Sequence, residues 1–175
     1  MLFLTADTHF SHAKVIKMCN RPYSSVEEMD ESLIDNWNKT VSKKDIVYHC
    51  GDFAFRNTEY YVKRLNGQIH LILGNHDKVN LASQKYFKSI SQIKIVNTKP
   101  KIVLCHYAMR RWPALHYDAW HLYGHSHGRL KEEFLSFDVG VDCWNYKPVS
   151  YDQVCEKMQK KLVDRFTERI ITHNM

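Results

Sequence analysis

Residues 69–77 read IHLILGNHD, an apolar run followed by a glycine, an amide, an imidazole and a carboxylate. The apolar run, Ile69 to Leu73, has the length and the branched side chains of a buried strand. Polar residues directly after a strand are common, because a strand has to end, and a surface turn is one interpretation of residues 74–77. The other interpretation is part of an active site, which would require matching residues elsewhere in the chain.

The same arrangement recurs at four other strand ends. Short apolar runs predict strands, and polar residues come directly after four more of them. They are Asp7-Thr8-His9 after Leu2–Ala6, Gly51-Asp52 after Ile46–Cys50, His106 after Ile102–Cys105, and Gly124-His125-Ser126-His127 after Trp120–Tyr123. In α/β folds, sites form at the carboxyl ends of strands, so we expect these side chains to gather at one sheet edge.

Segments with helical periodicity alternate with the early apolar runs. Apolar residues from Val26 to Val41 recur at three- and four-residue steps, which indicates an amphipathic helix. Further helices are predicted for 57–65 and 79–88, and a capping box at Ser150-x-x-Gln153 opens a last helix that runs to about residue 169. Additional strands are predicted for Ile93–Val96 and Phe134–Val141. The pattern predicts a single α/β domain over residues 1–175, a sandwich of sheets with helices outside.

The bulk composition is that of an ordinary globular protein, with 44% hydrophobic and 25% charged residues. The net charge of +6 and the isoelectric point near 9.0 favour anionic partners, such as phosphates or nucleic acid, without requiring one. The five cysteines are never spaced as C-x-x-C, and neither a signal-like segment nor an apolar run of about 20 residues is present. These features predict a cytoplasmic protein without membrane association.

The residue types at the five strand ends indicate metal binding. The chain has eleven histidines, several of them clustered with Asp, Asn and Gly. Carboxylate and imidazole without thiolate suit divalent manganese, iron, zinc or nickel rather than a structural zinc site of cysteines. Seven such ligands are too many for one tetrahedral ion and suit two ions that share a bridging carboxylate. Two ions about 3.5–4 Å apart can clamp a phosphoryl oxygen during in-line displacement.

Taken together, the five blocks resemble the pattern of the calcineurin-like metallophosphoesterase superfamily, which reads D-x-H, G-D, G-N-H-D/E, H and G-H-x-H. All five are present in this order between residues 7 and 127. Other segments resemble the small bacterial and phage branch of that superfamily: DTHFSH at 7–12, NRPY at 20–23, HYAMRRW at 106–112 and VGVD at 139–142. The resemblance implies a two-sheet β-sandwich flanked by helices, which agrees with the fold predicted from the pattern of strands and helices.

The resemblance also implies a role for each motif residue. Asp7, His9 and His127 would hold the first metal, Asn75, His106 and His125 would hold the second, and Asp52 would bridge both. His76 would not bind metal but would stabilise the transition state and protonate the leaving alkoxide. Asp77 would orient His76, because a carboxylate fixes the tautomer of an imidazole. The implied cofactors are two divalent ions, manganese first, with iron, zinc or nickel as alternatives.

These roles predict a phosphoester hydrolase in which a metal-bridging hydroxide attacks phosphorus and His76 is the general acid. The preferred substrate is a phosphodiester of a small or cyclic nucleotide, because the chain is too short for large accessory domains. A phosphomonoesterase or phosphoprotein phosphatase remains an alternative, since all these substrates present the same phosphoryl group. A DNA or RNA nuclease is a further alternative, which the positive charge and the segment Arg110–Trp112 allow. A non-catalytic scaffold is disfavoured, because every ligand is retained.

Residues near the motif blocks are candidate substrate contacts. They are His12, Arg21, Arg110 and Arg111, and for each of them a solvated surface position is the alternative. His49 is predicted to be a packed histidine or one that supports the site. His116 and His121 are predicted to lie on a polar rim, and Trp112 and Trp120 either stack a base or pack around a rigid loop. The sequence makes no prediction of the oligomeric state.

Overall fold

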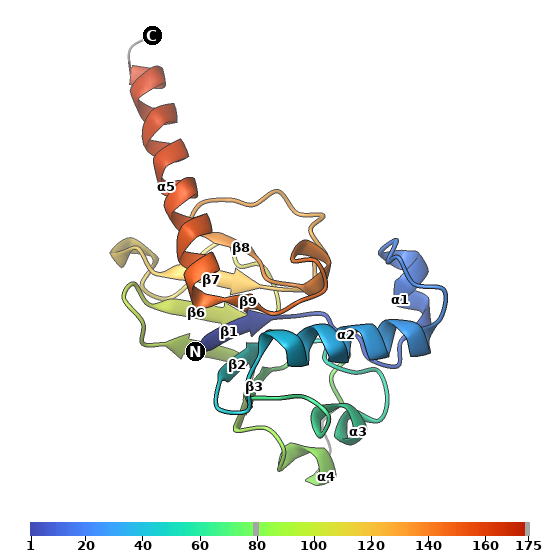
Figure 1. The fold of residues 1–175 in the computed structure, drawn as a ribbon. Helices are drawn as coiled ribbons and strands as arrows, with labels where there is room; N and C mark the ends of the chain where they lie inside the picture. Colours follow the sequence, from blue (N-terminus) through green and yellow to red (C-terminus); the bar gives the residue numbers. More distant parts are fainter. Residues whose placement is uncertain (79–80, 174–175) are drawn as a thin grey trace.

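The computed structural model of the chain describes residues 1–78 and 81–173, and its strands form two sheets that pack against each other (Figure 1). The strands are β1 (Leu2–Thr5), β2 (Ile46–His49), β3 (Gln68–Ile72), β4 (Ser89–Ser91), β5 (Ile93–Val96), β6 (Ile102–Cys105), β7 (Trp120–Tyr123), β8 (Ser136–Asp138) and β9 (Val149–Ser150). One sheet has five strands in the order β4-β3-β2-β1-β9, and the other has four in the order β5-β6-β7-β8. The predicted architecture of two sheets flanked by helices is therefore confirmed.

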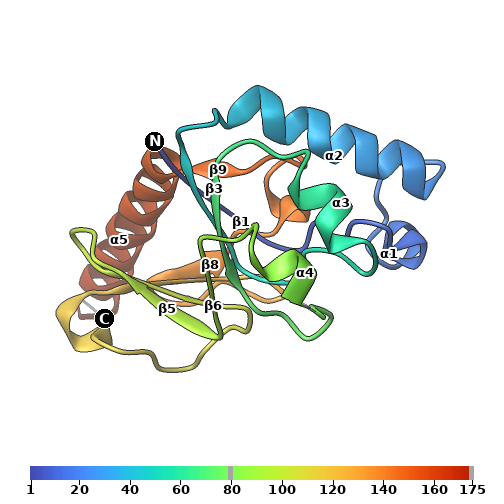
Figure 2. The ribbon, with the colours of Figure 1, turned by 90° about the horizontal axis from the view of Figure 1, so that it is seen from below.

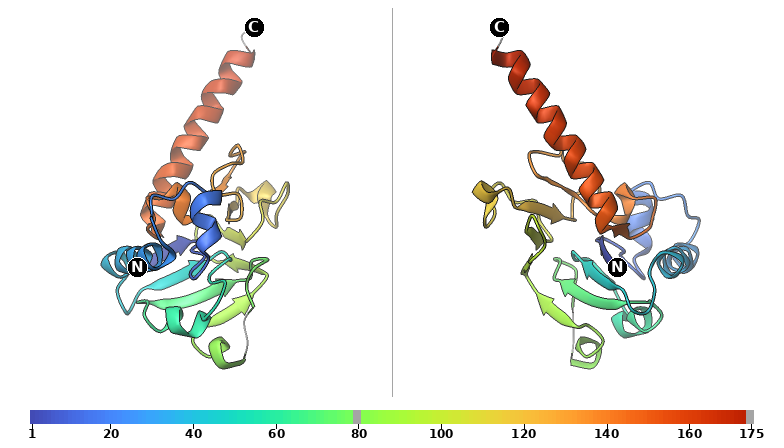
Figure 3. Two further views of the ribbon diagram at one scale, coloured as in Figure 1. Left: turned by 90° about the vertical axis from the view of Figure 1, so that its right-hand side faces the viewer. Right: turned by 60° about the vertical axis from the view of Figure 1, so that its left-hand side comes forward.

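Helices cover the outside of the sheets. They are α1 (Ala13–Met18), α2 (Val26–Thr40), α3 (Thr58–Val62), α4 (Leu81–Gln84) and α5 (Tyr151–His173), and short 3₁₀ turns lie at Leu115–Tyr117 and Val141–Cys143. Helix α2 runs along one side of the molecule with α3 and α1 near it (Figure 2). Helix α5 starts at the sheets and extends away from them (Figure 3). In the described part of the chain, no helix combines the length and apolar character that crossing a membrane requires.

The first core lies between α2 and the five-stranded sheet. Helix α2 begins where the sequence predicts it, because the side chain of Ser25 accepts a hydrogen bond from the Glu28 amide at 3.1 Å. Its apolar stripe, which includes Met29 and Trp37, is buried against residues such as Phe3 of β1. Each such large side chain stabilises the fold by about 1.5–3 kcal/mol relative to full exposure.

The second core lies between the two sheets. Side chains alternate along β1, so Phe3 belongs to the core under α2 whereas Leu4 belongs to the core between the sheets. Leu4 shares that core with Leu104 of β6 and Leu122 of β7. Met158 of α5 is buried in the same core and anchors the start of the long helix.

Strand direction brings the polar blocks together. Strands β1, β2 and β3 are parallel to one another, and β6 and β7 are also parallel. An isolated parallel bridge between Ala6 and Gly140 links the end of β1 to the segment after β8. The carboxyl ends of these strands therefore deliver their following loops to one shared edge, as the sequence predicts for this fold class.

Several boundaries differ from the sequence prediction. The predicted strand 134–141 shrinks to Ser136–Asp138, because Phe134 has a left-handed φ of 52° and a 3₁₀ turn begins at Val141. The sequence pattern does not predict the short elements α1, β4 and β9. The capping box is confirmed, since the Ser150 amide donates to Gln153 Oε1 at 2.9 Å. Residues 79–80 of the predicted helix 79–88 lie outside the described residues, and α4 covers Leu81–Gln84.

Candidate metal centre

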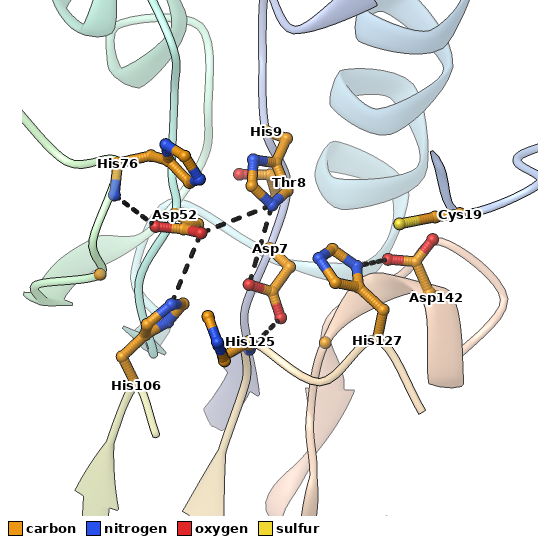
Figure 4. Close-up of polar contacts among 12 residues, drawn as sticks. Asp7, Thr8, His9, Cys19, Asp52, His76, His106, His125, His127 and Asp142 are labelled. Atoms are coloured by element: carbon orange, nitrogen blue, oxygen red, sulfur yellow. Dashed lines mark hydrogen bonds and ion pairs between the residues drawn. The ribbon is translucent and has the colours of Figure 1, made fainter. Parts of the chain in front are cut away.

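The structure brings the motif residues of all five strand ends into one cluster (Figure 4). Among the seven predicted ligands, two groups of three side chains each hold their ligand atoms within 4.8 Å of one another. The first group is Asp7, His9 and His127, and the second is Asp52, His106 and His125. The remaining predicted ligand, Asn75, joins the second group, because its Oδ1 lies 3.0 Å from His106 Nε2. All seven residues predicted as metal ligands therefore lie together.

Two ligand atoms of the first group are buried without a hydrogen-bond partner. They are Asp7 Oδ1 and His9 Nε2, which lie 4.0 Å apart. A buried polar atom with no partner is costly, and native proteins rarely retain one without a reason. A divalent cation between these two atoms would satisfy both of them, so the residues present fit a metal.

Asp52 lies between the two groups. Its Oδ2 is 3.6 Å from His9 Nε2 and 3.5 Å from His106 Nε2, whereas its Oδ1 accepts a hydrogen bond from the His76 amide at 2.9 Å. One carboxylate oxygen thus faces a histidine of each group. This is the placement that a bridging ligand requires.

Hydrogen bonds from one ring nitrogen set the tautomers of two of these histidines. The Nδ1 of His106 donates to the carbonyl oxygen of Cys50 at 2.8 Å, and the Nδ1 of His127 donates to Asp142 Oδ2 at 2.7 Å. In each ring the Nε2 is therefore the nitrogen that a metal could bind in place of a proton. A neutral imidazole nitrogen with a fixed orientation is the form in which histidine binds a metal.

Burial and neighbouring charges shift the ionisation of the cluster. Burial raises the pKa of Asp7 to about 8 and lowers the pKa of His9 to about 2. Burial also works against the charge on Asp52, but the hydrogen bond and charge of His106 hold the pKa of that carboxyl well below its usual value. Asp7 and His9 are thus buried groups whose ionisation a divalent cation bound beside them would change.

The backbone at the cluster is strained. Five of the seven predicted ligands have left-handed φ angles between 49° and 67°: Asp7, His9, Asp52, His125 and His127. For residues other than glycine, this conformation costs a free energy of roughly 1–2 kcal/mol. Strained backbone conformations are common at functional sites, where they position side chains at a cost in stability.

This strain predicts an unusual order of stability at His125, an exposed ligand with a φ of 67°. We expect the metal-free His125→Gly variant to have a free energy of unfolding about 1 kcal/mol higher than His125→Ala, because glycine adopts this backbone without a penalty. Denaturant unfolding with chelator present measures the difference. The same pair of substitutions at Lys39, inside helix α2, is the control and should give the opposite order. An alanine variant at least as stable as glycine at position 125 would contradict the strained backbone.

The loop over residues 74–77 is tied to the loop that carries Asp52. A β-carbon on Gly74 would collide with both the amide and the carboxylate of Asp52, so only glycine allows this approach. Asp77 accepts hydrogen bonds from the amides of Asp52, Phe53 and Gly74 at 2.8–2.9 Å. The predicted role of Asp77 in orienting His76 is therefore wrong, because its oxygens are bonded to backbone amides that join the two loops.

The two predicted non-ligand histidines lie on the open side of the cluster. The ring centroid of His76 is 5.8 Å from that of His9, and the ring centroid of His12 is 5.3 Å from His9 and 6.0 Å from His76. His76 is exposed, whereas His9 and Asp52 are buried. The predicted acid and the candidate contact His12 are thus both within reach of a ligand at the cluster.

Arg21 is not a substrate contact, which corrects the sequence prediction. Its guanidinium is fully buried, forms a bidentate ion pair with Asp142 at 2.8 Å, and donates to the carbonyl oxygens of Asp7 and Thr8 at 2.6 and 3.0 Å. The Arg21 side chain therefore holds the backbone of Asp7 and Thr8 in place. A buried guanidinium with this many acceptors has no donor to offer a phosphate.

Asp142 is the residue that sequence reasoning missed. In the sequence it is only the last residue of the segment VGVD, whereas in the structure it joins His127 to Arg21. Burial lowers the pKa of His127, but the hydrogen bond to Asp142 outweighs burial and raises that pKa to about 10. Carboxylates in this position make the imidazole a stronger ligand and fix its orientation.

We expect Asp142→Asn to weaken metal binding about 10–100-fold at the first group, because the amide cannot supply the negative charge behind His127. Calorimetric titration with Mn²⁺ measures the affinity. Asp118→Asn, which removes the same charge from an exposed turn, is the matched control. Equal affinity of the two variants would show that Asp142 does not act on the metal centre.

The remaining candidates lie elsewhere. Arg110 and Arg111 are exposed and line a cavity of about 580 Å³ beside Trp112, so their contact with substrate stays a prediction. His49 is packed as predicted, with Nε2 donating to Thr8 Oγ1 at 3.0 Å. His121 is wrongly predicted as a rim residue, because its ring is buried and its Nε2 accepts the Met109 amide at 3.1 Å.

Comparison with known proteins agrees with this geometry. Residues 1–137 match the model of the calcineurin-like phosphoesterase superfamily domain. An uncharacterized protein of Methanocaldococcus jannaschii, MJ1445, is 36% identical over 94% of this chain and 94% of its own length. The gene 66 protein of Mycobacterium phage D29 is 32% identical over 44% of this chain and 40% of its own length. The crystal structure of AQ665 from Aquifex aeolicus, a protein of unknown function, has the same fold, with a TM-score of 0.72 and 24% identity over 89% of this chain and 98% of that one.

The family match covers the segment that carries every predicted ligand, and the ligand groups are assembled in the structure. The chain therefore belongs to the calcineurin-like phosphoesterase superfamily and is a phosphoester hydrolase.

Proposed function

We propose that this protein is a two-metal phosphodiesterase that acts on small nucleotide-like substrates. The observation that carries the proposal is the position of Asp52 Oδ2, 3.6 Å from a histidine of the first group and 3.5 Å from a histidine of the second. A shared carboxylate oxygen is what two neighbouring divalent ions need. When bound, two such ions would lower the pKa of a water molecule and neutralise charge on the phosphoryl oxygens.

The protein contributes the metal ligands, the general acid and an exposed side of the cluster that a substrate can reach. Asp7 and His9 form a buried floor, and Asn75, His76 and His125 are exposed above it. His76 would donate a proton to the leaving oxygen, and its backbone amide keeps it next to Asp52. Manganese, iron, zinc and nickel all suit this set of oxygen and nitrogen donors, and we propose manganese.

A diester is preferred over a monoester because of the charges next to the cluster. Arg21, the arginine nearest in sequence to the first block, is buried and bound to Asp142, so it cannot neutralise the second negative charge of a monoester. The side chains seen beside His9 on the open side are the imidazoles of His12 and His76. A singly charged diester suits this environment better than a doubly charged monoester.

A nuclease remains the second candidate, but one of its supports is lost. Trp112, which the sequence allowed to stack a base, is only 8% exposed, and its Nε1 donates to the Ala119 carbonyl at 2.7 Å. Its ring is therefore part of the packing rather than a platform for nucleic acid. The net charge of +6 and the exposed Arg110 and Arg111 are the supports that are left.

Hydrolysis of bis-p-nitrophenyl phosphate against p-nitrophenyl phosphate, with Mn²⁺ and with chelator, tests the proposal. We expect Mn²⁺-dependent turnover that favours the diester. Preference for the monoester would assign a phosphatase instead. Cleavage of DNA or RNA that weakens steeply with salt would assign a nuclease.

A further inference from the structure

A cavity of about 690 Å³ adjoins the metal centre, and nothing described so far uses it. We call it the α3 cavity, and its lining includes Phe55, Arg56, Tyr60, Lys63, Arg64 and Lys78. The segment that lines it begins at residue 54, two residues after Asp52, and Lys78 lies two residues after His76. The same two loops therefore supply both the metal centre and this cavity.

The side chain of Phe55 lies between the α3 cavity and the metal centre. Its ring stacks on His12 with centroids 4.7 Å apart and an interplanar angle of 11°, and its centroid is 6.4 Å from that of His76. Phe55 is 44% exposed and also lines the cavity. A substrate whose leaving oxygen is protonated by His76 therefore has this cavity beside it on the leaving-group side.

The positive charges of the cavity are of two kinds. Lys63 is neutralised by Glu59 at 2.6 Å, and Arg64 forms a bidentate ion pair with Glu31 at 2.6 Å. Arg56 and Lys78 are exposed and form no ion pair within the described part of the chain. The guanidinium of Arg56 lies 5.8 Å from the centroid of the Phe55 ring. The cavity thus presents two uncompensated positive charges.

We propose that the α3 cavity holds the leaving group of the substrate and that Arg56 and Lys78 bind a phosphate on it. The substrate class is a phosphodiester whose leaving group carries its own phosphate, such as the 5′-phosphorylated dinucleotide pApA. A guanidinium and an ammonium are suited to phosphate, the first bidentately and the second as a point charge. The exposed rings of Phe55 and Tyr60 offer an aromatic wall for the attached nucleoside.

The proposal rests on the proposed phosphodiesterase function and adds a reaction with defined products. Water attacks the bridging phosphorus of pApA, and the bond from phosphorus to O3′ of the first nucleoside breaks. O3′ takes the proton from His76 and leaves as AMP, while the attacked phosphorus stays on the second AMP. The released AMP is the molecule that the α3 cavity would hold.

Binding of AMP against adenosine tests the subsite without catalysis. Calorimetry with chelator present removes the metals, so the phosphate of AMP has only the protein to bind. We expect AMP to bind at least tenfold more tightly than adenosine and both Arg56→Gln and Lys78→Gln to lose most of that difference. Lys160→Gln, on the exposed face of α5, removes the same charge and should keep it. Equal binding of AMP and adenosine to the wild type would overturn the proposal, as would loss of the difference in Arg111→Gln instead.

Kinetics with Mn²⁺ then separate the subsite from the function. We expect kcat/KM for pApA to exceed that for ApA about tenfold, and this preference to disappear in Arg56→Gln/Lys78→Gln but not in Lys160→Gln. Turnover of both dinucleotides without a preference would overturn the subsite and leave the phosphodiesterase in place. No turnover of any diester, with AMP binding that still depends on Arg56, would overturn the proposed function and leave the phosphate site.

Discussion

Replacing Asp52 with alanine will remove metal binding and activity together. The reason is that Asp52 Oδ2 faces His9 Nε2 at 3.6 Å and His106 Nε2 at 3.5 Å, so both ligand groups lose their shared anion in one step. We expect the metal content after dialysis to fall from two ions per chain to fewer than one. Turnover of bis-p-nitrophenyl phosphate should fall to the level measured with chelator. Elemental analysis and the hydrolysis assay on the same preparation provide the two numbers.

A second variant separates charge from packing at this position. Asp52→Asn keeps the shape of the side chain and can still accept the His76 amide through its oxygen, but it cannot carry the negative charge. We expect it to lose metal as Asp52→Ala does. Asp118→Ala, on an exposed turn, is the control for removing a carboxylate elsewhere. If Asp52→Ala and His76→Ala bound metal equally, the bridging assignment would be wrong.

Replacing His76 with alanine will have the second large effect, on turnover alone. The His76 ring is exposed and belongs to neither ligand group, and its contact with Asp52 is made by the backbone amide, which alanine keeps. Both metals should therefore stay bound. Loss of the proton donor should lower kcat for a dinucleotide by a factor of about 10²–10⁴.

The leaving group gives a sharper test of the acid. A nitrophenolate leaves readily without a proton, whereas a ribose alkoxide does not, so His76→Ala should lose far less activity on bis-p-nitrophenyl phosphate than on ApA. His116→Ala is the control, because His116 is exposed, packs on Tyr117 and belongs to neither ligand group. An equal loss on both substrates would remove His76 from the role of general acid.

Local sequence patterns predict much of the fold and nearly all of the ligand cluster. The periodicity of Val26–Val41 predicts α2, and the run Ile102–Cys105 predicts a strand with the same bounds as β6. The ligands follow strands that are parallel, so their position after each strand is enough to predict that they meet. Residue type then restricts the chemistry, because carboxylates and imidazoles without thiolates suit divalent ions.

The wrong predictions concern side chains whose interaction partners are not their neighbours in the sequence. Arg21 lies beside a motif block in sequence, yet its carboxylate partner, Asp142, is 121 residues away, so a buried ion pair looked like a free phosphate ligand. Asp77 follows His76 directly, but its three bonds go to amides of the Asp52 loop and of Gly74. His121 is the one imidazole in the strand Trp120–Tyr123, and only packing shows that its ring is buried.

The sequence by itself determined which residues gather in the ligand cluster and which strands deliver them, because side chains at strand ends are placed by the backbone that carries them. Only the tertiary structure decided what each supporting residue does. Whether Arg21 binds substrate or Asp142, and whether Arg56 and Lys78 are neutralised or free, depends on which opposite charges the folded chain brings within hydrogen-bond distance. That depends on packing between distant segments, which no local pattern encodes.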